Sequence, residues 1–208
     1  MAVNKPPGLV VHPTYKNWSG TLLNGLLWHV RARTDVLPRI ITRLDKDTSG
    51  LVLVALTPEV QAQVQRDAAA GRVTKEYLAL ASGTPSPPEG VISLPLARSP
   101  VDRRLVIVTP EGQISETRYE VLASWHGHSL VRCELVTGRT HQIRVHLAAR
   151  GWPILGDAVY GVPDPRITRQ ALHAWRVTLP HPLTRTPMRI EAPIPADLQG
   201  LITGSAAP

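Results

Sequence analysis

The sequence predicts an α+β fold. Three observations lead to this prediction: several short alternating runs are typical of antiparallel strands, a few segments between them have helical spacing or helix caps, and twenty prolines are spread through many short loops. At 208 residues the chain is long enough to bury a core. No internal repeat or linker divides it, so we expect residues 1–208 to form a single domain.

The first 80 residues contain the clearest element signals. Thr57 is a hydroxyl cap, Pro58 stands at the first helical position, Glu59 lies in the first turn, and Gly71 follows the last apolar residue, so these four positions bound a helix. We expect, in chain order, the end of a strand near residue 5, a helix over residues 20–30, a buried strand over 51–55, a helix over 57–70 and an alternating strand over 74–80.

The remainder of the chain alternates in the same way. Asp102-Arg103-Arg104 has the composition of a charged hairpin tip, and Thr140 is expected to cap a helix that ends before Gly151. The expected elements are short strands near 91–94 and 105–109, a hairpin over 115–124 and 129–136, a helix over 140–150, strands over 172–179 and 188–192, and a closing helix over 195–202.

The composition limits the class of protein. A net charge of +7 suggests a polyanionic partner, although an inert basic surface would give the same number. The absence of Phe disfavours a broad base-stacking platform. Cys133 is the single cysteine, so no internal disulfide can form, and the histidines show no metal-ligand spacing. No apolar stretch reaches the length of a membrane span, and no signal peptide is evident. We expect a cytoplasmic protein without metal or cofactor.

The turn over residues 41–50 is the first candidate site, because an apolar run of strand length follows it and would hold it rigidly. Asp47 precedes Thr-Ser-Gly, a sequence typical of a turn in which a short acid bonds backbone amides. Asp45 lies between Arg43 and Lys46. A carboxylate among cations stays ionised, which suits a nucleophile or an electrostatic stabiliser. Most acids in such turns are nevertheless solvated or structural.

Residues 137–146 form a second cluster, where a strand gives way to the start of a helix. Amides exposed at a helix N-terminus attract anions, and Arg139 and Thr140 would add to that attraction. Arg144 lies one turn further on, among apolar residues. A buried guanidinium needs a carboxylate partner, for which Asp45 is attractive. Arginines on a solvated helix are an equally good interpretation of this cluster.

Tyr77 marks a third cluster, in residues 75–80. It alternates with leucines on the expected strand, and by itself this pattern favours a core tyrosine with its hydroxyl bonded at the surface.

Together these clusters resemble the motifs of the RluA-type pseudouridine synthases, within the RNA pseudouridylate synthase family. Residues 42–50, 75–80 and 138–147 match in the family's order, and the resemblance extends from about residue 3 to about 198. Further matches lie in residues 4–13, 154–161, 172–174 and 181–182. The related RsuA-type synthases share the Arg-Leu-Asp turn but lack the Thr-His-Gln-Ile-Arg form of residues 140–144.

Two departures from the family pattern are visible. Thr42 stands where the family normally has His, which affects one local hydrogen bond but no catalytic group. Most of the strand that usually precedes Asn4 is missing. The resemblance therefore implies a single catalytic domain over residues 1–208, without an N-terminal RNA-binding module. Its implied fold is a bent, mixed and mostly antiparallel β-sheet flanked by helices and loops, with a basic catalytic cleft.

The resemblance also implies an activity: an isomerase that converts uridine within structured RNA to pseudouridine. Asp45 would be the catalytic aspartate, which either attacks the anomeric carbon or removes the neighbouring ribose proton. Tyr77 would stack on the flipped base and assist proton removal from its carbon 5, and Arg144 would pair with Asp45. The implied RNA-binding residues are Arg43, Lys46, Arg139, Thr140 and His141.

Ribosomal RNA is the expected substrate, and transfer RNA is the alternative. A third possibility is a non-catalytic RNA-binding or ribosome-assembly protein, although binding alone would not require Asp45, Tyr77 and Arg144 as a set. We expect a monomer with no obligate protein partner.

Overall fold

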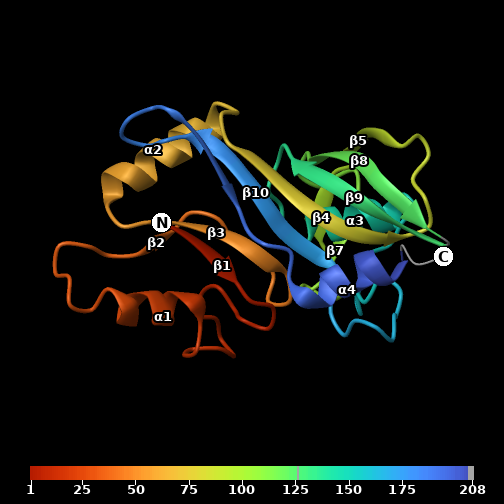
Figure 1. Cartoon of the computed structure of the whole chain (residues 1–208), viewed down its shortest axis with the longest axis horizontal. Coiled ribbons are helices and arrows are strands. Elements are labelled where there is room, and N and C mark those ends of the chain that lie inside the picture. Colours follow the sequence, from red (N-terminus) through yellow and green to blue (C-terminus); the bar gives the residue numbers. More distant parts are fainter. Residues whose placement is uncertain (126, 206–208) are drawn as a thin grey trace. The chain divides into compact units, whose positions relative to one another are not determined.

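A computed structural model describes residues 1–125 and 127–205 (Figure 1). The chain groups into two compact units. The first unit contains residues Met1–Lys75 and Ala174–Pro193, and the second contains Glu76–His173 and Ile194–Pro208. Each unit is described separately, and the single domain expected over residues 1–208 stays a prediction.

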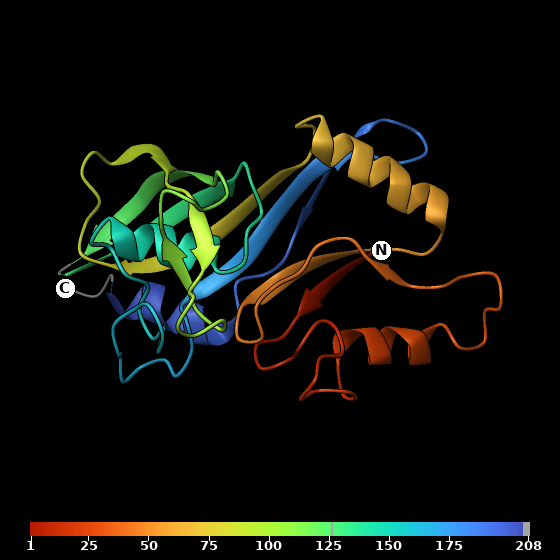
Figure 2. The same cartoon turned by 180° about the vertical axis from the view of Figure 1, so that it is seen from behind.

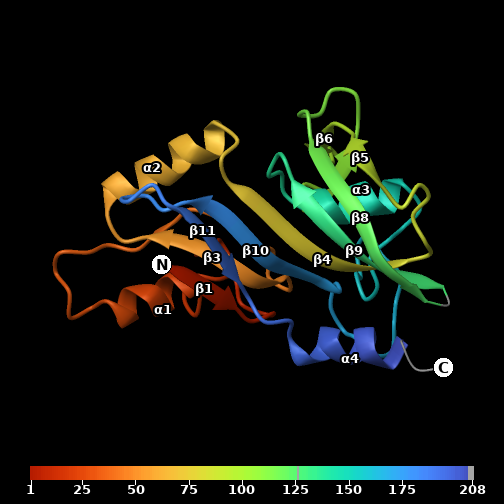
Figure 3. The ribbon, with the colours of Figure 1, turned by 45° about the horizontal axis from the view of Figure 1, so that its top comes forward.

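The first unit is organised around the strand β3 (Ser49–Ala55). This strand pairs antiparallel with β1 (Ala2–Lys5) and β2 (Arg39–Ile40), and its other neighbour is β10 (Leu172–Pro180), most of which belongs to this unit. The strand β11 (Pro187–Glu191) pairs antiparallel with β10. Figure 3 shows β1, β3, β10 and β11 as neighbouring strands. All seven residues of β3 are buried, so the central position of this strand explains its unbroken apolar run.

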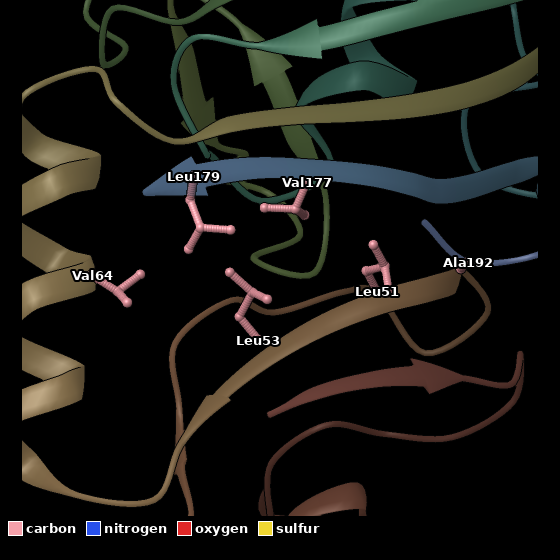
Figure 4. Packing of buried hydrophobic residues seen from close by; sticks show 6 residues of the cluster. All are labelled: Leu51, Leu53, Val64, Val177, Leu179 and Ala192. Carbon is pink, nitrogen blue, oxygen red and sulfur yellow. The ribbon is translucent and has the colours of Figure 1, made fainter. Parts of the chain in front are cut away.

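The two faces of β3 pack against different groups of side chains. Successive side chains of a strand point to opposite faces. Leu51 and Leu53 join Val64 of the helix α2 (Pro58–Ala69) in one cluster with residues of β10 and with Ala192 (Figure 4). Val52 and Val54 contact a second cluster, which includes Leu22 and Leu26 of the helix α1 (Leu22–His29). Burial on both faces therefore fixes β3 firmly.

The second unit contains four strands in the order β4 (Thr74–Ser82), β9 (His128–Leu135), β8 (Glu116–Trp125) and β5 (Glu89–Ser93), each antiparallel to its neighbour. The first two residues of β4 belong to the first unit. A separate hairpin joins β6 (Leu96–Arg98) to β7 (Val106–Val108). The helix α3 (Gln142–Ala149) contacts this hairpin, as Figure 2 shows from behind. The helix α4 (Ala196–Ser205) is held by an ion pair between Asp197 and Arg169.

The predicted α+β class is confirmed, and so are most of the expected elements. Thr57 caps α2 with Pro58 in its first turn, and the hairpin expected around residue 126 is formed by β8 and β9, although His126 lies outside the described residues. The short strands β2 and β6 were not predicted. No helix in the described residues is long and apolar enough to span a membrane. The bend of the sheet and the basic cleft stay predictions.

Candidate functional site

The carboxylate turn of residues 42–48 enters β3 in the first unit. It is closed by a hydrogen bond from the Thr48 amide to the Asp45 carbonyl oxygen, 3.2 Å long. Gly50 follows with φ of +111°, and a Cβ at this position would lie 2.2 Å from the carbonyl oxygen of Ala174. Only glycine fits such a close approach of two backbones at a positive φ. The turn is therefore anchored where β3 passes β10.

Lys5 supports the same turn through hydrogen bonds of its side chain. Its side chain is fully buried, and the Nζ atom donates hydrogen bonds of 2.8 Å to the carbonyl oxygens of Lys46 and Pro6. A buried ammonium is stable only when it is well bonded. One acceptor is the carbonyl oxygen of Lys46, which lies between Asp45 and Asp47 in the chain. Lys5 therefore fixes the backbone that carries the candidate catalytic carboxylate.

Thr42, which stands where the family normally has His, forms a local hydrogen bond of its own. Its Oγ1 accepts a bond of 2.8 Å from the Leu53 amide. Asp45 and Asp47 are half-buried, whereas the side chains of Arg43 and Lys46 are exposed. The turn thus presents two cations to solvent beside a carboxylate that is partly withdrawn from it.

Arg144 forms a buried, bidentate ion pair within the second unit. Its Nε and Nη2 atoms donate to Oδ2 and Oδ1 of Asp157 at 2.6 and 2.8 Å, and the two side chains are 6% and 0% exposed. Asp157 also accepts from the amides of Val159 and Tyr160. Burial raises the pKa of Asp157, but Arg144 and these amides outweigh burial and hold that pKa below its usual range. Asp157 is therefore an anionic clamp for Arg144.

Tyr160 adds a second restraint on this cluster. The Arg144 guanidinium lies 5.0 Å from the centre of the Tyr160 ring, within the range of a cation–π interaction. The Tyr160 hydroxyl oxygen accepts from the Val106 amide and lies 2.8 Å from Nδ1 of His141. The ring consequently links α3, the β6–β7 hairpin and the turn at Asp157.

The start of α3 differs from the prediction. Thr140 does not cap this helix: His141 occupies the cap position with φ of +55° and makes no side-chain cap bond. The Gln142 side chain takes over the local bonding. Its Oε1 atom accepts from the Arg139 amide and the Thr137 hydroxyl, and its Nε2 atom donates to the Glu116 carbonyl and the Thr117 hydroxyl. Bonds to β8 and to the preceding loop thus replace the expected cap.

Tyr77 lies in β4 opposite Cys133 of β9 and is 8% exposed. Cys133 is buried as expected, and burial raises the pKa of its thiol to about 12. Asp45 belongs to the first unit, whereas Tyr77 and Arg144 belong to the second. The expected pairing of Arg144 with Asp45 and the stacking role of Tyr77 therefore stay predictions. Within residues 1–125 and 127–205, no three His, Cys, Asp or Glu side chains group as metal ligands.

Lys5, which bonds the carboxylate turn, and Asp157 and Tyr160, which contact Arg144, were not predicted from the sequence as supports of the candidate residues. A signal existed for Asp157, because a buried arginine requires a carboxylate and this acid lies inside a family motif. Lys5 gave no signal, since a lysine before two prolines is ordinarily exposed. Of the predicted RNA-binding group, Arg139, Thr140 and His141 lie together before α3 and are at least partly exposed.

Comparison with known proteins identifies the family. The model of RNA pseudouridylate synthases matches residues 1–149. A ribosomal large subunit pseudouridine synthase D from Nitrosomonas europaea is 44% identical over 96% of this chain, which spans 61% of that protein's length. The protein of the same name from Pasteurella multocida is 40% identical over 97% of this chain and 67% of its own.

Among solved structures, the human RNA pseudouridylate synthase domain containing 1 is similar with a TM-score of 0.75. It is 27% identical and covers 100% of this chain and 91% of that one. These matches confirm the family that the motifs indicated. The chain belongs to the RNA pseudouridylate synthase family.

Proposed function

We propose that this chain is the catalytic part of an RNA pseudouridine synthase that isomerises uridines in ribosomal RNA. The observation that carries the proposal is the support of the turn that contains Asp45. This turn enters a strand that is buried on both faces, and its backbone accepts a hydrogen bond from the Lys5 side chain. Rigid mounting suits a carboxylate whose chemistry depends on placement. Ribosomal RNA is favoured because relatives at 40–44% identity are named for the large ribosomal subunit.

The reaction is an isomerisation without net oxidation. The bond between N1 and C1′ of uridine breaks, a bond between C5 and C1′ forms, C5 loses its proton and N1 ends with one. Asp45 acts at the ribose, either as the nucleophile on C1′ or as the base for the proton on C2′. Both roles need an ionised carboxylate at a fixed distance from the sugar.

Arg144 and Tyr77 assist Asp45 in this proposal. Asp157 and Tyr160 hold the Arg144 guanidinium from two sides, so the arginine enters the site already oriented. Such a preorganised cation stabilises negative charge without reorganising during the reaction. Tyr77 stacks on the flipped base and assists removal of the C5 proton.

RNA binding rests on the exposed cations and on the start of α3. The target uridine must leave its base stack, which costs a few kcal/mol. Arg43, Lys46 and Arg139 contact phosphates and offset that cost, while Thr140 and His141 add hydrogen bonds. We infer that the protein works as a monomer in the cytoplasm, where its proposed substrate is made.

The proposal is tested with unmodified transcripts that carry tritium at C5 of uridine. Pseudouridine formation releases this tritium to water, so the assay follows the bond change directly. Large-subunit ribosomal RNA fragments should release tritium with the wild-type chain, and the Asp45→Asn variant provides the matched inactive control. Release from transfer RNA alone would move the substrate to that class. Binding of both RNAs without any release would overturn the proposal in favour of a non-catalytic RNA-binding protein.

A further inference from the structure

The exposed aromatic side chains of this protein are concentrated in one short segment. Tyr15, Trp18 and Trp28 are 84%, 73% and 68% exposed. Every other tyrosine and tryptophan in residues 1–125 and 127–205 is buried or half-buried. Three rings within 14 positions are therefore presented to solvent in a chain that has only nine tyrosines and tryptophans.

The fold does not require these rings. The helix α1 packs into the core through Leu22 and Leu26, and Trp28 lies on its exposed side. Tyr15 lies in a tight turn that is closed by two backbone hydrogen bonds between Thr14 and Asn17, of 3.0 and 2.8 Å. The turn and the helix thus hold large apolar groups in water, where they gain no burial.

Two of the rings have a cation beside them. Of the four lysines and arginines in residues 1–34, these are Lys16 and Arg31, whereas Lys5 is buried and Arg33 is paired with Asp35. The Arg31 guanidinium lies 3.8 Å from the centre of the Trp28 ring and donates to the Trp28 carbonyl oxygen, so a positive charge lies against one face of an exposed ring. Lys16 lies beside Tyr15 in the turn and is exposed. An aromatic face next to an unneutralised cation suits a partner that has both flat bases and phosphates.

We propose that Tyr15, Lys16, Trp18, Trp28 and Arg31 form an accessory surface that binds unpaired RNA bases by stacking. We call these five residues the aromatic surface. The inference rests on the proposed function for its RNA partner and adds a contact outside the family motifs that carry Asp45, Tyr77 and Arg144. The low aromatic content disfavoured a broad stacking platform, and the aromatic surface is a local one of three rings. A protein partner is less well matched, because an apolar contact would have to desolvate Lys16 and Arg31.

The test measures affinity for two RNA ligands by fluorescence anisotropy: a 12-nucleotide single strand and a blunt hairpin without unpaired ends. Loss of one aromatic side chain on which a base stacks weakens binding by about tenfold. Trp28→Ala and Trp18→Ala should each raise the Kd for the single strand by about this factor and leave the Kd for the hairpin within about twofold. Trp28→Phe keeps a stacking ring and should restore most of the affinity. Leu122→Ala, at a leucine of β8 that is also exposed, is the matched control and should change neither Kd.

Salt separates stacking from phosphate contact. The Trp28→Ala effect should be the same at low and high salt, whereas Arg31→Gln should lower the slope of log affinity against log salt by about one unit. Unchanged single-strand affinity in both tryptophan variants would overturn the proposal, whatever other partner uses the surface. An equal loss for the hairpin would overturn it too, because stacking requires unpaired bases.

These outcomes are distinguishable from failure of the proposed function. If wild-type protein releases no tritium from RNA but Trp28→Ala still weakens single-strand binding, the aromatic surface stands and the activity is wrong. If tritium is released normally and the tryptophan variants bind the single strand like wild type, the activity stands and the surface is wrong.

Discussion

The buried pair of Arg144 and Asp157 gives the sharpest stability prediction. Asp157→Asn keeps the shape of the side chain but removes the charge that faces the guanidinium in a bidentate contact. Both side chains are almost fully withdrawn from water, at 6% and 0% exposure, so solvent screening does not weaken the interaction. Breaking such a pair costs about 3–5 kcal/mol. In a chain of this length 1 kcal/mol shifts Tm by about 2–4 °C, so Tm should fall by about 6–20 °C.

The control is an ion pair of the same residue types at the surface. Asp102 and Arg104 are bonded at 2.6 Å, but their side chains are 30% and 89% exposed. Exposed pairs contribute about 1 kcal/mol or less, so Asp102→Asn should lower Tm by no more than about 4 °C. Thermal unfolding of both variants is followed by circular dichroism.

An activity measurement completes this prediction. Because Asp157 positions Arg144, the Asp157→Asn variant should form pseudouridine more slowly at temperatures where it is still folded, while its RNA affinity stays near that of wild type. If Asp157→Asn unfolds at the same temperature as Asp102→Asn and keeps the wild-type rate, the pair neither stabilises the fold nor positions Arg144, and the reasoning is refuted.

Three further predictions concern the carboxylate turn and the pH dependence. Lys5→Met removes a buried ammonium that bonds the backbone of the carboxylate turn, so the rate of pseudouridine formation should fall more than RNA affinity does. Equal losses of rate and affinity would contradict a positioning role. Gly50→Ala places a Cβ 2.2 Å from a backbone oxygen at a positive φ, so the folded chain should lose at least about 1–3 kcal/mol of stability in chemical denaturation. The control Gly25→Ala meets open space in α1 and should stabilise the fold by about 0.5–1 kcal/mol. Similar stability changes in the two variants would argue against a close backbone contact at Gly50. The pKa of Asp157 is lowered in the folded chain, so the stability that its carboxylate contributes is present above the ordinary carboxyl pKa near 4 and is lost as pH falls through the lowered pKa. The difference in Tm between wild type and Asp157→Asn should therefore narrow below about pH 4. A constant difference in Tm down to about pH 2 would contradict this.

Local patterns were sufficient to predict most elements of the fold. The cap at Thr57, the apolar run of β3 and the alternation of β4 each depend on neighbouring residues, and these signals are contained in a short window. The predicted start of α3 was wrong because its geometry depends on a distant strand. Gln142 bonds to β8, and this bonding replaces the cap expected from Thr140.

The candidate site was predicted only in part for the same reason. Asp45, Tyr77 and Arg144 were predicted as site residues because family motifs mark them, and their roles stay predictions. The groups that hold them come from elsewhere in the chain: Lys5 bonds to the backbone 41 positions away, and Asp157 lies 13 positions beyond Arg144. A buried lysine and a buried acid violate the expectation for their residue types, and only their partners explain them.

We propose that Asp45 performs the chemistry and contributes little to RNA affinity. Asp45→Asn and Asp47→Asn change neighbouring acids of the same turn in the same way, and an amide at position 47 can still bond the turn backbone. Tritium release from uridine C5 in a ribosomal RNA fragment should vanish in Asp45→Asn and persist in Asp47→Asn, while both variants bind the fragment with a Kd within a few-fold of wild type. Pseudouridine formation by Asp45→Asn at the wild-type rate would contradict the account.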